Sequence, residues 1–132
     1  MHNPIITILA AGLAGWIFGA VWYGVLSKPY QRALGLSPED CKDKKMPMVP
    51  MVAAFLAACV MSAVLYLLLT NLGVMGVGHS AIAGLTIGLG FLATSTLVNN
   101  LFQQKPMALT VIDGGHWVLG VVVESVVIAL LA

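Results

Sequence analysis

Three side chains near the C-terminal end of the sequence have the chemistry to bind or transfer a proton: Asp113, His116 and Glu124. Asp113 and His116 are three residues apart, a spacing that brings an acid and an imidazole together on the surface of an α-helix. Imidazole titrates closer to neutral pH than the other side chains do. Asp113 and Glu124 also share one helical face with Trp117 and Gly120, with His116 at its edge. The spacing therefore predicts a polar stripe along one helix.

The stretch that carries this stripe, Ala108–Ala132, is otherwise apolar and long enough to cross a membrane. Its thirteen Leu, Ile and Val residues favour insertion by roughly 4–8 kcal/mol in total. One ionised carboxylate near the bilayer centre costs about 2.5–3.5 kcal/mol on a similar scale. The segment can insert, but the acidic groups offset much of the favourable free energy.

The composition of the whole chain is that of a membrane protein. Of the 132 residues, 60% are hydrophobic and 8% are charged, whereas a soluble domain has about 25% charged residues. No Asp, Glu, Lys or Arg occurs from Met46 to Gln104, a run much longer than one span of about 20 residues. We predict an all-α integral membrane protein, a single domain over residues 1–132. Its four transmembrane helices form two helical hairpins, at about residues 4–26, 48–70, 79–102 and 108–131.

The polar segment 27–47 connects the first two spans. Within it, Ser37-Pro38-Glu39-Asp40 predicts the start of a short surface helix, because Ser caps helices, Pro is tolerated in the first turn and acids suit the positive end of the dipole. All six Lys and Arg residues lie in this segment or in the turn after the third span. The positive-inside rule therefore predicts that both loops are cytoplasmic and both termini outside, as in a multi-pass protein of a bacterial inner membrane. We expect interfacial positions for five residues: Trp22, Tyr23, Lys42, Lys44 and Lys45.

Small residues mark two faces where helices can approach closely. Gly15 and Gly19 continue a stripe from Ala11 on the first helix, and Gly84 and Gly88 lie on the third. Because four helices of this length can barely bury both faces, we predict a homo-oligomer, most simply a dimer or trimer. At 100° per residue, the face of the third helix that carries its glycines contains six residues: Gly84, Gly88, Phe91, Ser95, Asn99 and Phe102.

The polar stripe on the last helix has predicted neighbours at two depths. At about 1.5 Å per residue, Glu124 lies about 16 Å beyond Asp113, level with Tyr66 of the second helix. If the stripe is structural, Glu124 is protonated or hydrogen-bonded to Tyr66. If it is functional, it lines a path for a proton or a small solute, since ionisable residues inside a membrane are functional candidates. Asp113 itself is expected in a polar layer with four residues: Trp22, Tyr23, Asn99 and Asn100.

Several stretches match one family pattern: Trp22-Tyr23 closing the first helix, the loop from Lys28-Pro29-Tyr30 to Asp40, and Asn99-Asn100-Leu101-Phe102 closing the third helix. With the Ala-rich second helix, they make the chain resemble the small membrane proteins called domain of unknown function 1761. The resemblance covers nearly the whole chain. It implies four membrane helices with a cytoplasmic loop after the first, and it implies no particular activity. His116-Trp117 and Glu124 fall outside the matching motifs.

Other classes of function are disfavoured by the residues present. Met46, Met48 and Met51 are soft ligands that suit copper(I), but thioethers also pack as adaptable apolar groups, so we predict no metal site and no cofactor. We expect no enzyme, because no nucleophile has partners at useful spacing, and no nucleic-acid partner. Two functions stay open. One is an oligomeric structural protein that contacts lipid or a partner, and the alternative is a channel or transporter for protons or a small solute.

Overall fold

The structure, a computed structural model, describes residues 3–41, 47–74 and 76–132. All regular secondary structure in these ranges is helical, and four helices are long and apolar enough to cross a membrane. The predicted fold class, an all-α membrane protein with four spanning helices, is confirmed. The four spans are α1 (Pro4–Val25), α4 (Met48–Asn71), the continuous run α5 (Val77–Ile87), η1 (Gly88–Ala93) and α6 (Thr94–Phe102), and α7 (Met107–Leu131).

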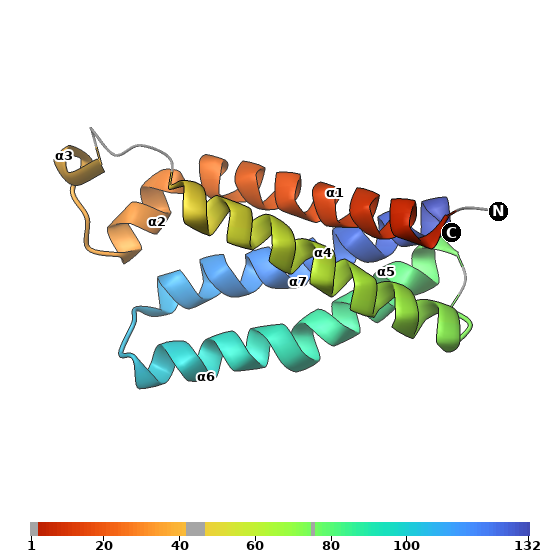
Figure 1. Ribbon diagram of the computed structural model, residues 1–132. Coiled ribbons are helices and arrows are strands. Elements are labelled where there is room, and N and C mark those ends of the chain that lie inside the picture. Colours follow the sequence, from red (N-terminus) through yellow and green to blue (C-terminus); the bar gives the residue numbers. More distant parts are fainter. Residues whose placement is uncertain (1–2, 42–46, 75) are drawn as a thin grey trace.

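Helix α7 is the central helix of the bundle. It packs against α1 on one side and α5 on the other, and α1 packs against α4 (Figure 1). The two chain termini lie together at one end, which we call the terminal end. The connection from α1 to α4 and the turn from α6 to α7 lie at the opposite end, the loop end (Figure 1). This central position explains why α7 has the largest buried share of the four spans.

The connection between α1 and α4 contains two short helices. Helix α3 (Pro38–Cys41) begins where the sequence predicted a surface helix. The Ser37 N–H donates to Asp40 Oδ2 at 2.8 Å, and the Asp40 N–H donates to Ser37 Oγ at 3.3 Å, a reciprocal cap. Helix α2 (Ser27–Ala33) was not predicted, because only Leu26 separates it from α1. The predicted interfacial lysines Lys42, Lys44 and Lys45 lie outside the described residues.

A π-helical turn, η1, changes the predicted face of the third span. A π-turn accommodates one extra residue compared with an α-helical turn, so the inward face is displaced by one position after Gly88. Asn100 is consequently buried, whereas Asn99 is exposed. Phe91 and Phe102 are 72% and 86% exposed. The prediction of one face running from Gly84 to Phe102 is therefore wrong beyond Gly88.

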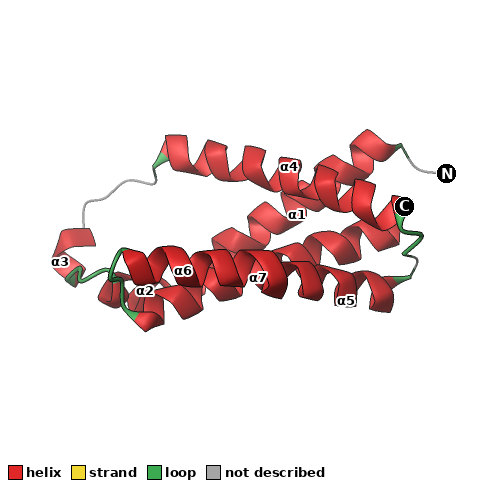
Figure 2. Ribbon diagram, turned by 90° about the horizontal axis from the view of Figure 1, so that it is seen from below, coloured by secondary structure: helices red, strands yellow, loops and turns green. Residues whose placement is uncertain are grey.

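The apolar core lies toward the terminal end of the bundle. Its fully buried members come from α1, α4 and α7: Ala11, Leu65, Leu69, Val121 and Ile128. Toward the loop end, the first turns of α4 stand away from the other spans (Figure 2). The first turns of α4 thus diverge from the rest of the bundle (Figure 2).

Candidate functional site

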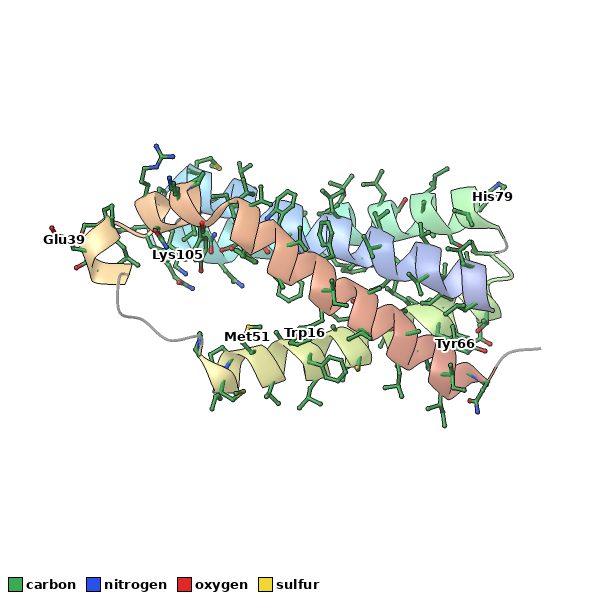
Figure 3. All side chains as sticks on the ribbon, turned by 90° about the horizontal axis from the view of Figure 1, so that it is seen from above. Trp16, Glu39, Met51, Tyr66, His79 and Lys105 are labelled. Atoms are coloured by element: carbon green, nitrogen blue, oxygen red, sulfur yellow. The ribbon has the colours of Figure 1, made fainter. Side chains whose placement is uncertain are left out.

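A cavity of about 150 Å³ lies between α1, α4 and α7, on the loop side of the apolar core. Trp16 reaches from α1 towards α4 beside Met51 (Figure 3), and its indole N–H donates to the Met51 carbonyl at 3.1 Å. Helix α7 contributes polar side chains to the wall. The lining includes large side chains from all three helices: Trp16, Tyr23, Met51, Met61, His116, Trp117 and Glu124.

Glu124 lies at the inner end of this cavity and is 3% exposed. Its carboxyl group packs against the backbone of Gly15, where a Cβ atom would lie 2.8 Å from Glu124 Cγ. A side chain at position 15 would therefore exclude the glutamate. The Oε2 atom is buried and has no hydrogen-bond partner in the described part of the chain.

His116 lies two helical turns closer to the loop end. A Cβ atom at Gly19 would lie 2.7 Å from His116 Nε2, so this glycine makes room for the imidazole as Gly15 does for the carboxyl. The ring lies between two aromatic rings, with centroid distances of 4.9 Å to Tyr23 and 4.7 Å to Trp117. His116 Nδ1 is buried and, like Glu124 Oε2, finds no hydrogen-bond partner among the described residues.

Asp113 is held by α1 at the outer end of the stripe. The Tyr23 hydroxyl donates to Asp113 Oδ1 at 2.6 Å, a short hydrogen bond. The Trp22 indole N–H donates to the Ile112 carbonyl at 3.0 Å. Trp22 and Tyr23, predicted as interfacial anchors, thus direct their polar atoms to α7. In α2, partial burial and the nearby Asp113 carboxylate raise the pKa of Tyr30 above its ordinary value.

The family comparison covers nearly the whole chain. The model of a family described as "Protein of unknown function (DUF1761)" matches residues 6–129. The chain belongs to the DUF1761 family. No curated protein and no solved structure matches it. The resemblance seen in the sequence is therefore confirmed, and the match extends over all four spans of this DUF1761 protein.

Three of the residues predicted for the polar site lie elsewhere. Asn100 is buried and donates to Thr110 Oγ1 at 3.1 Å, which joins α6 to α7 near the loop end. Asn99 is exposed on the far side of α6. Tyr66 packs against the apolar core instead of bonding Glu124, whose Oε2 stays unpartnered. The structure therefore brings together Asp113, His116 and Glu124 with α1, but not with Asn99 or Tyr66.

Both glycine faces of the DUF1761 protein pack against α7 of the same chain. Gly15 and Gly19 face α7, as described above. A Cβ atom on Gly84 would lie 2.6 Å from Ser125 Oγ, and one on Gly88 would lie 2.9 Å from the Val118 Cα atom. Gly84 and Gly88 therefore allow the third span to pack closely against α7.

Sequence reasoning missed the aromatic and thioether part of the cavity wall, formed by Trp16, Met51, Met61 and Trp117. The sequence did contain one indication of where this cavity lies. Helices α1 and α7 are antiparallel, so a glycine on one can oppose a bulky polar residue on the other. Gly15 with Glu124 and Gly19 with His116 form such pairs, and Trp16 lies next to the first of them.

The cavity has few of the ligands that a metal ion needs. In the ranges 3–41, 47–74 and 76–132, no group of three or more His, Cys, Asp or Glu residues could hold a metal ion. The polar groups that the cavity does present, Glu124 and His116, are side chains that can accept or release a proton.

Proposed function

We propose that this protein moves protons, or a small solute coupled to protons, across the membrane. The observation that carries the proposal is the pair of buried, unpartnered polar atoms, His116 Nδ1 and Glu124 Oε2, on the wall of one cavity. Ionisable residues inside a membrane segment are functional candidates. Here, two of them have polar atoms free to meet a proton, a water molecule or a solute.

The unpartnered carboxyl has an energetic cost that packing alone does not explain. A buried polar group without a hydrogen bond destabilises a protein by about 1–3 kcal/mol, and an apolar residue of similar shape avoids this. Leucine would also be cheaper to insert into the bilayer. The Oε2 atom of Glu124 has no described hydrogen-bond partner that offsets the cost. A ligand that binds there supplies the missing interaction.

The polar stripe defines the direction of movement. From Asp113 to Glu124 the stripe covers roughly 16 Å of α7 at about 1.5 Å per residue. Beyond Glu124, the apolar core formed by Leu65, Leu69 and Ile128 blocks the terminal end. We infer that transport requires a second conformation in which this core opens.

Three further parts of the proposal concern the setting of the protein. We propose a bacterial inner membrane with both termini outside, because every Lys and Arg of the sequence lies in segment 27–47 or in the turn after the third span. We propose no enzymatic activity. A homo-oligomer stays a prediction, but it would need a surface other than the glycine faces, since those pack inside the chain. For the same reason, an oligomeric scaffold is the weaker of the two functions.

Proton flux into vesicles tests the proposal. Purified protein is reconstituted into liposomes that contain a pH-sensitive dye, and a pH gradient is applied with valinomycin and potassium to balance charge. We expect wild-type vesicles to equilibrate faster than protein-free vesicles, and Glu124→Gln to abolish the difference.

Glu39→Gln is the matched control, because it removes an exposed carboxyl in α3 and should leave the flux unchanged. Equal rates for wild type, Glu124→Gln and empty vesicles would exclude proton conduction. Solute coupling is then tested with the cation described below. If neither proton nor cation moves, the oligomeric structural function becomes the better explanation.

A further inference from the structure

We infer that the cavity between α1, α4 and α7 binds a small organic cation, with its ammonium group against Glu124 and its apolar part against the aromatic and thioether wall. The inference rests on the proposed function and gives it a substrate class. It follows from the charge, the surface chemistry and the size of the cavity.

The charge of the wall favours a cation. Glu124 is an acid, and no Lys or Arg is among the described residues that line the cavity. Two of the donors on the wall already have partners: Trp16 donates to Met51 and Tyr23 donates to Asp113. The buried polar atoms of the wall that have no hydrogen-bond partner among the described residues are Glu124 Oε2 and His116 Nδ1. An ionised carboxylate accepts hydrogen bonds only, and a neutral imidazole has one accepting nitrogen. A positively charged donor would satisfy the ionised form of this carboxyl, and no Lys or Arg among the described lining residues would attract an anion.

The rest of the wall suits the carbon skeleton of such a ligand. Trp16, Tyr23 and Trp117 offer aromatic faces from α1 and α7, and cations are attracted to these faces, most strongly to Trp. Met51 and Met61 add thioethers from α4, which adapt to ligands of different shape. A purely inorganic cation would leave this apolar surface without a partner.

The volume of the cavity suits a ligand with one ring. An apolar cavity of about 150 Å³ in another protein holds benzene, and this cavity has about the same volume. A cation with one ring or a short branched chain fits that space.

Protons must compete with this ligand, because a protonated Glu124 carries no charge for an ammonium group. The groups around the carboxyl in the described residues are few. Helix α1 presents Gly15, α4 presents the Cys59 thiol within electrostatic range, and α5 meets this turn of α7 through Gly84. On α7 itself, His116 is the nearest titratable side chain toward the loop end. Lowering the pH therefore protonates Glu124 or His116, and either event weakens binding of a cation.

A charge series of one-ring ligands tests the inference on the purified full-length protein in detergent. Benzylamine, which is protonated at neutral pH, is compared with neutral benzyl alcohol and with benzoate. Binding is followed by quenching of tryptophan fluorescence and by calorimetry. We expect benzylamine to bind at least tenfold more tightly than either analogue, and its affinity to fall as the pH is lowered. Equal affinity for benzyl alcohol, or tighter binding of benzoate, would overturn the inference.

Two variants locate the site, with Glu39→Gln as the control for charge elsewhere. Glu124→Gln should weaken benzylamine binding at least tenfold, because hydrogen bonds to charged groups are worth about 1.5–3 kcal/mol. Trp117→Leu keeps an apolar wall without an aromatic face and should weaken binding roughly 2- to 30-fold. If Glu124→Gln does not fold, Trp117→Leu and the pH dependence still decide. Unchanged affinity in the folded variants means that the cation binds elsewhere.

This binding measurement is independent of transport. Binding without flux in vesicles would leave the cation site standing and refute the proposed transport. Proton flux that depends on Glu124 without cation binding would refute only the substrate class.

Discussion

At position 124, the side chain that binds a cation should not be the one that makes the protein most stable. Its buried Oε2 atom has no described partner, and its side chain fits closely against Gly15. Glu124→Leu fills a similar volume without a polar group. We expect the free energy of unfolding of this variant to be about 1–3 kcal/mol higher than that of wild type. We also expect the variant to lose cation binding. Thermal unfolding in detergent measures the first effect. A clear loss of stability would mean that the carboxyl makes a stabilising interaction after all.

Removing the Tyr23–Asp113 hydrogen bond should, in contrast, destabilise the protein. The bond is 2.6 Å long and joins α1 to α7 at the loop end. Tyr23→Phe removes the donor and leaves the carboxylate without it, so we expect the unfolding free energy to fall by about 1–3 kcal/mol. Tyr66→Phe is the control, since Tyr66 packs against the core. If both variants unfold at the same temperature, the bond contributes nothing to stability.

At the scale of helices, Gly15 allows α1 to approach α7. Gly15→Ala places a methyl group against the Glu124 side chain, and overpacking of this kind costs about 1–3 kcal/mol. Gly24→Ala, in the same helix, meets nothing within 4 Å and should be neutral or slightly stabilising. Thermal unfolding of both variants checks the contrast. The double variant Gly15→Ala with Glu124→Ala should recover much of the loss, which identifies the contact responsible.

The sequence was informative about helices and less so about their faces. Long apolar runs with prolines and glycines between them determine four spans, because each must satisfy its backbone hydrogen bonds internally. The π-turn at Gly88–Ala93 could not be predicted from a fixed period of 100°, and it is why Asn100 replaces Asn99 on the inner face. The polar stripe of α7 was predictable from spacing alone. The contribution of Trp16 and Met51 was not, because it depends on how α4 crosses α1.

At the scale of the whole molecule, the two ends of the bundle should face opposite sides of the membrane. We expect the loop end to be cytoplasmic. In a background without Cys41 and Cys59, Gln103→Cys reports on the α6–α7 turn, and Gly78→Cys reports on the start of α5 at the terminal end. Both positions are exposed. An impermeant maleimide added to intact cells should label only Gly78→Cys. Labelling of Gln103→Cys alone would show that the topology is the reverse of the expected one.

The π-turn has a consequence for how the chain tolerates changes of length. A membrane helix that packs on both sides of a deleted residue normally loses register, because every later side chain turns by about 100°. In the third span, the turn at Gly88–Ala93 already holds one residue more than an α-helix needs. Deleting Gly90, where an added Cβ atom would meet nothing within 4 Å, should convert it to a plain α-helical turn. Gly84 and Asn100 would then both keep facing α7.

Deleting Val98 instead should rotate Asn100 away from Thr110 and break their hydrogen bond. Comparing the expression and thermal stability of these two shortened chains would show whether the extra residue is dispensable. If the Gly90 deletion proves as damaging as the Val98 deletion, then the π-turn does not act as a spare position. If it is tolerated, members of the DUF1761 family with one residue fewer at this point can keep the same packing on either side of it.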